Sequence, residues 1–239
     1  MNILLTNDDG IKSLGLRKLE NVLKQYGDVY VVAPLVEQSG KACSINSFKG
    51  IKIQKFDEHH IAVEGSPVDC VEVGVALLNK KIDLVVSGCN NGYNLNNDIM
   101  YSGTCGACVQ ACFANINAIA FSIANKDYFD LIEEKAKRVL EYIFTNNLLV
   151  KGYYLNVNLP IYEKDLGIKI TKIVDKVIET YYPGEMDEDG KFVIYRKSLN
   201  KVDDEECDYT SVHKGYISIT PMSQSTFNKE FYNLIKSKV

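Results

Sequence analysis

The sequence contains few of the residues on which several large classes of protein depend. Histidine occurs only three times in 239 residues, so a histidine-rich two-metal centre cannot be assembled. No long run of lysine and arginine is present and the formal net charge is -4, which disfavours a groove for a nucleic-acid polymer. No apolar stretch approaches the length of a membrane span, and the chain begins with a strand-like segment, so we expect neither a membrane-embedded part nor a signal peptide.

The composition is that of an ordinary globular protein. Hydrophobic residues make up 46% of the chain and charged residues 24%, which disfavours disorder. The length suits one large core, and we expect a single domain over residues 1–239. The seven cysteines are an odd number without the spacing of a disulfide scaffold, so we expect reduced thiols and a cytoplasmic location.

Short apolar runs alternate with segments of helical periodicity along the first two thirds of the chain. Continuously apolar strands suit a parallel sheet that is buried on both faces, and helices between such strands suit right-handed crossovers. This order predicts an α/β fold with a doubly wound, mostly parallel, Rossmann-like sheet. The expected strands are 3–5, 29–33, 82–86, 118–121 and 154–157, with a hairpin over 51–56 and 61–63; the expected helices are 16–26, one starting at Ser66-Pro67, and 128–144.

The region after Pro160 has a different character. Alternating segments over 168–174 and 192–195 flank a turn-rich stretch at 183–190, and a terminal helix is expected over 226–237. Residues 161–239 are therefore predicted to form a β-rich extension with a terminal helix. Such a segment is too small to hold an independent core.

The sequence Asn7-Asp8-Asp9-Gly10 is the most informative in the chain. It follows the first apolar strand, and two adjacent carboxylates at the end of a strand repel each other. A cation is the simplest neutralising partner. The alternative interpretation is a strand-to-helix turn in which an aspartate caps the helix.

Several other predicted strands also end in polar residues. Glu37 and Ser39 follow the second strand, a segment over 87–92 that includes Asn90 follows another, and Ser122 ends a third. Ligands of open α/β sheets bind outside the carboxyl ends of the strands, so we expect one shared site. Carboxylate, hydroxyl and amide oxygens are hard ligands that suit Mg²⁺ or Mn²⁺ better than zinc.

A phosphate-binding arrangement is predicted further along the chain. The asparagine-rich segment 90–98 leads into Ser102-Gly103-Thr104 at the start of an apolar helix. These residues supply hydroxyls, a close approach of the main chain and free N–H groups at a helix N-terminus. The alternative is a capped helix after an asparagine-rich turn. No Gly-Lys-Ser/Thr follows, so this is not a Walker motif.

The sequence resembles the SurE family of metal-dependent nucleotidases through most of its length. Several motifs occur in the order typical of that family. They are Leu-Thr-Asn-Asp-Asp-Gly at 5–10, Val-Ala-Pro at 32–34, Ser39-Gly40, Gly-Ser-Pro-Val-Asp-Cys at 65–70, Ser-Gly-Cys-Asn at 87–90, Tyr-Ser-Gly-Thr at 101–104, Asn-Val-Asn-Leu-Pro at 156–160 and Gly-Tyr-Ile-Ser-Ile-Thr-Pro at 215–221.

The resemblance implies a chemistry for these residues. It implies one divalent ion per subunit, Mg²⁺ or Mn²⁺, held by Asp8, Asp9, Ser39 and Asn90, and hydrolysis of nucleoside monophosphates to nucleoside and phosphate. It also implies a homodimer that exchanges its C-terminal arms, with further pairing to a tetramer left open. The family's 5' or 3' specificity and its activity on polyphosphate stay open for this chain.

The residue types fit roles in such a reaction. Asp8 or Asp9 is the best candidate to orient or deprotonate the attacking water. Phosphoryl oxygens would be bound by Asn94, Ser102, Gly103 and Thr104, with Asn94 also counted as catalytic because it can donate as charge develops. The chain departs from the family pattern at Leu35 and Val36, where Asp and Arg are usual, so substrate preference and rate stay open.

Two other functions and one other site remain compatible with the sequence. The first function is a phosphoaspartyl phosphatase with Asp8 as nucleophile, although the Asp-x-Asp spacing typical of that class is absent. The second is a non-catalytic module that binds a nucleotide or a metal. The site is the C-x-x-C of Cys105 and Cys108, followed by Cys112. These three share one helix face, which indicates buried packing, whereas a redox or thiolate site is the alternative.

Overall fold

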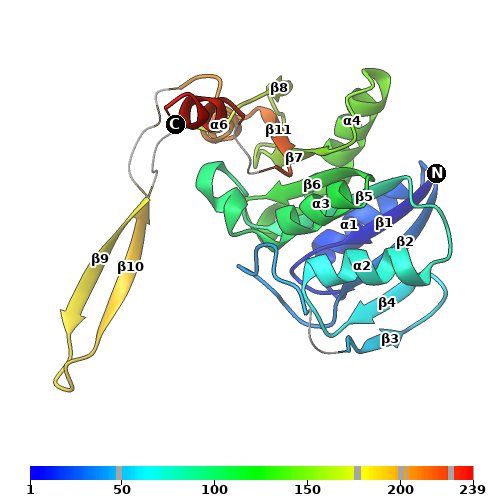
Figure 1. The fold of residues 1–239 in the computed structure, drawn as a ribbon, viewed down its shortest axis with the longest axis horizontal. Coiled ribbons are helices and arrows are strands. Elements are labelled where there is room, and N and C mark those ends of the chain that lie inside the picture. The colour runs from blue at the N-terminus through cyan, green and yellow to red at the C-terminus, as the bar shows by residue number, and fades with distance from the viewer. Residues whose placement is uncertain (47–49, 175–178, 199–201, 203, 226–228, 239) are drawn as a thin grey trace.

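A nine-stranded sheet forms the centre of the molecule (Figure 1), in a computed structural model that describes residues 1–46, 50–174, 179–198, 202, 204–225 and 229–238. The strand order is β3-β4-β2-β1-β5-β6-β7-β11-β8, and the six strands from β4 to β7 are parallel to one another. The predicted doubly wound α/β fold is therefore confirmed. The strands are β1 (Asn2–Thr6), β2 (Asp28–Pro34), β3 (Ile53–Lys55), β4 (His60–Val63), β5 (Leu84–Asn91), β6 (Asn117–Ile123), β7 (Tyr153–Leu159), β8 (Ile168–Ile170) and β11 (Ile217–Ser223).

Helices cover both faces of this sheet and divide the core into two layers. One layer packs beneath α1 (Leu14–Leu23) and α4 (Ile132–Thr145), and the other beneath α2 (Pro67–Leu77) and α3 (Gly103–Phe113). Figure 1 shows α2 and α3 side by side on the near face of the sheet. Shorter elements are the 3-10 helices η1 (Asn96–Met100) and η2 (Lys126–Leu131) and the helices α5 (Asp208–His213) and α6 (Lys229–Lys236).

The helix start predicted at Ser66-Pro67 has the geometry that its sequence indicates. The Ser66 hydroxyl accepts from the Asp69 main-chain N–H at 3.1 Å, and the Asp69 carboxylate accepts from the Ser66 N–H at 2.7 Å. Two N–H groups that would otherwise lack partners are thereby bonded. This capping box fixes the direction in which α2 leaves the edge of the sheet.

The order of the strands places the topological switch point of the sheet at the end of β1. From β1 the chain moves outward to β2 and β4 on one side, whereas β5, β6 and β7 lie on the other side. Open α/β sheets bind their ligands outside the carboxyl ends of the strands at such a point. Asp8 and Asp9 follow β1 directly and thus lie where this fold class binds its ligands.

The region after Pro160 contributes both to the sheet and to a separate hairpin. β8 and β11 extend the main sheet, with β11 antiparallel to β7 and parallel to β8. The strands β9 (Glu179–Met186) and β10 (Phe192–Ser198) pair only with each other among the described strands and project away from the body (Figure 1). The observed turn is shorter than the turn-rich stretch predicted at 183–190, because β9 continues through Met186.

Other element boundaries also differ from those predicted. β8 covers only the first part of the predicted strand 168–174, and the helix 128–144 begins with the 3-10 helix η2. Of the predicted terminal helix 226–237, residues 226–228 lie outside the described residues, and α6 covers Lys229–Lys236. The strand β11 and the helix α5 were not predicted as elements.

The three cysteines of α3 are buried packing residues rather than a redox site. All seven are unpaired, and Cys105, Cys108 and Cys112 are buried between α3 and the sheet. Burial raises the pKa of the Cys105 thiol to about 12, so the helix N-terminus does not produce a thiolate there.

None of the helices in the described part of the chain has both the length and the apolar character that crossing a bilayer requires.

Candidate active site

Two loops and the end of a strand bring the predicted metal ligands to the carboxyl edge of the sheet. Asp8 and Asp9 follow β1, Ser39 lies in the loop after β2, and Asn90 lies at the end of β5. Main-chain bonds connect the loops: the Gln38 N–H donates to the Asp8 carbonyl at 2.7 Å. The structure thus gathers the four predicted ligands at one edge of the sheet.

Asp8 is buried and is held by the start of α3. Its side chain is 3% exposed, and the Thr104 hydroxyl donates to its Oδ1 at 2.6 Å. Burial raises the pKa of Asp8, while the hydroxyl and the main-chain N–H of Thr104 act in the opposite direction. The positive end of the α3 dipole therefore faces the Asp8 carboxylate, which is an anion supplied by the protein itself.

Asp9 is more accessible and lies between β1 and β5. Its Oδ2 accepts from the Asn91 N–H at 3.0 Å. Burial first, and then the charge of Asp8, raise the pKa of Asp9 to about 6. Glu37 adds further negative charge and raises the pKa of both aspartates. The site therefore carries an excess of negatively charged carboxylates. A bound divalent cation would lower the pKa values of Asp8 and Asp9 instead of raising them.

The donor set fits a hard cation that is coordinated partly by solvent. The described residues contain no cluster of three or more His, Cys, Asp or Glu side chains placed to hold a metal. The predicted set falls outside that description because it has two carboxylates, one hydroxyl and one amide. Mg²⁺ commonly uses one or two carboxylates and keeps several waters, so two carboxylates are sufficient.

Asn90 is oriented by a bulge in β5. Ser87 and Asn90 are three positions apart, whereas their partners Ala120 and Ser122 are two positions apart, so β5 carries one extra residue. Bulges bend a strand and redirect its side chains. The Asn90 amide NH₂ donates to the Gly92 carbonyl at 2.8 Å, which leaves its Oδ1 as a possible ligand. The sequence at 87–92 suggested a loop, whereas pairing with β6 continues β5 through Asn91.

Ser39 is the most peripheral of the four residues. Its hydroxyl donates to Glu37 Oε1 at 2.8 Å and is exposed. A hydroxyl oxygen retains acceptor capacity while it donates, so this bond is compatible with metal ligation. The sequence identifies Glu37 as a polar residue after β2, but it does not predict that its charge lies beside Asp8 and Asp9.

The three side chains predicted to bind phosphate differ in whether they have a hydrogen left to donate to it. The Thr104 hydroxyl donates its hydrogen to Asp8. In this arrangement the side chain positions the carboxylate and does not donate to phosphate. Ser102 caps α3 by accepting from the Cys105 N–H at 3.1 Å and keeps its hydroxyl hydrogen. Asn94 donates one amide hydrogen to Ser122 at 2.8 Å and keeps the second.

Gly103 allows α3 to approach Asp8 closely. A Cβ atom at this position would lie 3.0 Å from the Asp8 Cβ, 3.0 Å from the Pro67 Cγ and 3.2 Å from Asp8 Oδ2. A larger residue would therefore push directly against Asp8. The absence of a side chain at Gly103 makes room for the Asp8 carboxylate, and its contact with phosphate stays a prediction.

A buried asparagine network fixes Asn94. The Asn94 carbonyl accepts from the amides of Asn156 at 2.8 Å and Asn158 at 3.0 Å, and its N–H donates to Asn158 Oδ1. Both supporting residues are fully buried in β7. Their role was not predicted, although two asparagines two residues apart on an apolar strand are a visible signal of buried polar contacts.

Comparison with known proteins agrees with this geometry. The sequence profile described as "Survival protein SurE" matches residues 3–180. The chain is 36% identical to "5'/3'-nucleotidase SurE" of Wigglesworthia glossinidia brevipalpis, with 98% of this chain and 96% of the relative covered. The chain belongs to the SurE family. A "5'-nucleotidase SurE" of Thermoanaerobacter sp. (strain X514) is also 36% identical, over 98% of this chain and 96% of that protein.

A solved structure of the SurE family has the same fold. The crystal structure of the Sure protein from Aquifex aeolicus matches with a TM-score of 0.89 at 34% sequence identity. The match covers 100% of this chain and 99% of that chain. The predicted family and fold class are both confirmed.

Proposed function

We propose that this SurE-family protein hydrolyses nucleoside monophosphates to nucleoside and phosphate at the Asp8–Asp9 edge. The observation that carries the proposal is the pair of adjacent carboxylates at the switch point of the sheet, one of them held by the start of α3. The names of the relatives support a nucleotide as substrate. Asp8, Asp9, Ser39 and Asn90 would hold Mg²⁺ or Mn²⁺, which supplies Lewis acidity toward the phosphoryl group when bound.

The side chains divide the remaining work. Asp9 is the more exposed carboxylate and is the candidate to orient and deprotonate the attacking water. Asp8, held by Thr104, positions the cation. Ser102 and Asn94 each have a hydrogen available for phosphoryl oxygens, where charge develops in the transition state.

Removal of divalent metal is expected to abolish hydrolysis. The carboxylates would then repel the substrate's phosphate, because the charges nearest to them are also negative. Phosphate release from a panel of nucleoside monophosphates and short polyphosphates should cease with EDTA and return with excess Mg²⁺ or Mn²⁺. Full activity in EDTA would refute the metal assignment. A trapped phosphoenzyme would favour the phosphoaspartyl mechanism, and nucleotide binding without turnover would favour a non-catalytic module.

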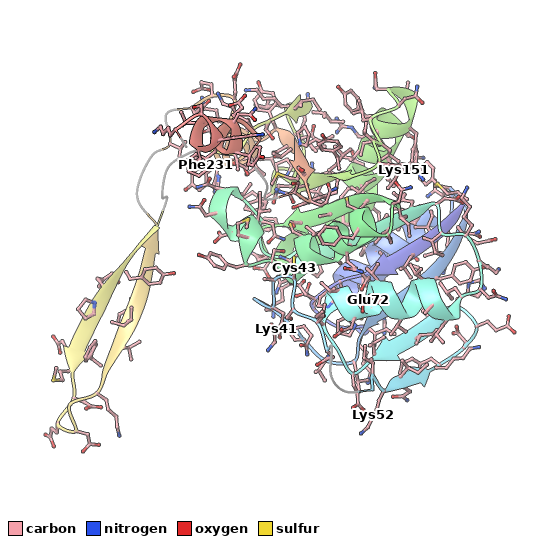
Figure 2. All side chains as sticks on the ribbon, in the orientation of Figure 1. Lys41, Cys43, Lys52, Glu72, Lys151 and Phe231 are labelled. Atoms are coloured by element: carbon pink, nitrogen blue, oxygen red, sulfur yellow. The ribbon has the colours of Figure 1, made fainter. Side chains whose placement is uncertain are left out.

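We further propose a cytoplasmic homodimer that exchanges its C-terminal arms. The hairpin β9–β10 exposes many large apolar side chains for its size, and Figure 2 shows them on a projecting ribbon. Exposed patches of this kind mark interfaces. The unpaired state of all seven cysteines supports a reducing compartment. The exposed apolar residues are Tyr181, Tyr182, Met186, Phe192, Val193, Ile194 and Tyr195.

Deletion of the hairpin is expected to remove dimerisation. Replacing 179–198 with a short glycine-serine linker removes this exposed apolar surface and leaves the nine-stranded sheet intact. Light scattering should give a dimer or a larger even assembly for the full chain and a monomer for the deletion variant. A monomeric full-length protein at micromolar concentration would contradict the proposed exchange.

A further inference from the structure

A cavity of about 480 Å³ lies beside the candidate active site. Its lining comes from the loop after β2, the end of β4 and the first turn of α2. Figure 2 labels Lys41, one of the lining residues, on the loop that passes below α3. Small-molecule pockets typically have volumes of roughly 300–1,000 Å³, so this volume suits part of a nucleotide.

Two contacts join this cavity to the Asp8 site. Gln38, which lines the cavity, donates its N–H to the Asp8 carbonyl at 2.7 Å. Ser66 lines the cavity, and the next residue, Pro67, lies against Gly103. These contacts place the cavity next to the loops that carry Asp8 and Ser102.

The cavity lining combines a few apolar side chains with a larger number of polar and charged ones. Val36 is 63% exposed and Ile45 is 52% exposed, and neither is buried by the described part of the chain. Asn46 is held by the fully buried Asp69, which accepts from its N–H at 2.9 Å and from its Nδ2 at 2.7 Å. A carboxylate only accepts, so the amide must present its NH₂ to Asp69, and its carbonyl oxygen accepts no hydrogen bond from the residues that the structure describes.

We propose that this cavity binds the nucleoside part of the substrate, with Val36 and Ile45 against the base and Asn46 accepting from a nucleoside N–H or O–H. This inference rests on the proposed nucleotidase function. It assigns substrate preference to Val36, one of the positions at which the chain departs from the family pattern. In such a pocket the apolar side chains provide contact area and the polar groups fix the orientation of the ligand.

A second cavity, of about 590 Å³, is the competing location. It runs along α1 and is lined by Lys12, Arg17, Phe56 and His60 among others. His60 is at the amino end of β4, the end opposite the Asp8 edge, and pairs there with Glu20 and Asp57. Lys12 brings one end of this cavity to the loop after β1, but a base bound against Phe56 would lie toward the amino end of β4 and away from the carboxyl edge.

The test compares Val36→Ser and Ile45→Ser with Phe56→Ser, a control in the competing cavity. Adenosine alone is the probe for binding, measured by calorimetry, so that this readout does not depend on turnover. Each of the first two variants should weaken adenosine binding roughly tenfold. Each should also lower kcat/KM for adenosine monophosphate relative to glycerol phosphate by a similar factor. Val36→Ile, which keeps an apolar side chain, should retain the wild-type values of both quantities. Phe56→Ser should leave both unchanged.

The results separate this inference from the proposed function. Unchanged adenosine affinity in folded Val36→Ser and Ile45→Ser proteins would overturn the nucleoside site, as would a loss of affinity confined to Phe56→Ser. If the wild type hydrolyses adenosine monophosphate but binds no adenosine, the site is refuted and the activity stands. If adenosine binds through Val36 and Ile45 but no phosphomonoester is hydrolysed, the site stands and the proposed function fails.

Discussion

Replacing Asp8 with asparagine is expected to lower kcat/KM for nucleoside monophosphates by a factor on the order of 1,000. The substitution keeps the shape of the side chain and an acceptor for the Thr104 hydroxyl, but it removes one of two charges that would bind the cation. The melting temperature should not fall, because the neutral amide relieves the repulsion between Asp8 and Asp9. Initial rates across a series of Mg²⁺ and Mn²⁺ concentrations measure the effect.

Asp28→Asn provides the matched control for this prediction. Asp28 is exposed at the amino end of β2, far from the carboxyl edge, and the same change of charge there should leave kcat/KM unaltered. A combination of lost activity and retained stability at Asp8 identifies a functional carboxylate. Wild-type rates for Asp8→Asn at low metal concentration would remove Asp8 from the metal site.

The central sheet was predictable because its strands carry their own signal. β1, β2, β6 and β7 are short apolar runs separated by helical periodicity, and burial on both faces demands that composition. The end of β5 was not predictable in the same way. Its residues Ser87 to Asn91 are of turn-forming types, and they remain in the strand only because β6 pairs with them across a bulge.

The site shows a similar division between what local sequence specifies and what packing decides. The position of Asp8 and Asp9 followed from the strand that precedes them. The partner of Thr104 did not, because Thr104 and Asp8 are 96 residues apart and meet only when α3 packs beside the end of β1. The sequence identified a helix N-terminus suited to an anion, but the anion that it faces is the Asp8 carboxylate.

The region after Pro160 was predictable in composition rather than in arrangement. Its alternating segments indicated strands, but alternation does not specify which edge a strand joins. β8 and β11 join the main sheet, whereas β9 and β10 form the hairpin. α5 was missed because its residues Asp208–His213 make only one and a half turns, too few for a helical period to be recognised.

Replacing Asp165 with asparagine is expected to destabilise the protein by about 3–5 kcal/mol, the usual cost of leaving one partner of a buried ion pair uncompensated. Lys135 of α4 and Asp165 each have side chains only 1% exposed, and their charged atoms are 3.0 Å apart. Arg138 adds two hydrogen bonds to the same carboxylate, at 2.7 and 3.1 Å. The variant would leave the Lys135 ammonium buried without its counter-charge. Urea unfolding at neutral pH measures the loss.

The pH dependence of this loss distinguishes an ion pair from a simple packing defect. Burial opposes ionisation of Asp165, but the hydrogen bonds from Arg138 and Lys135 outweigh it and hold its pKa below the usual range. A lowered folded pKa adds stability above the unfolded value of about 3.9, and that stability disappears as the pH falls through the folded value. The difference between wild type and Asp165→Asn should therefore narrow below about pH 4.

Asp130→Asn serves as the comparison for Asp165→Asn, because Asp130 pairs with Lys18 at 3.2 Å but its side chain is 93% exposed. Solvent screens such a pair, so its loss should have a much smaller effect on the urea midpoint. Equal effects at the two positions, or a pH-independent loss at Asp165, would show that the buried charges do not stabilise the connection between α4 and the loop before β8. A larger effect at Asp165 than at Asp130 would instead show that this buried ion pair links α4 to the loop before β8, and thereby the parallel part of the sheet to its C-terminal strands.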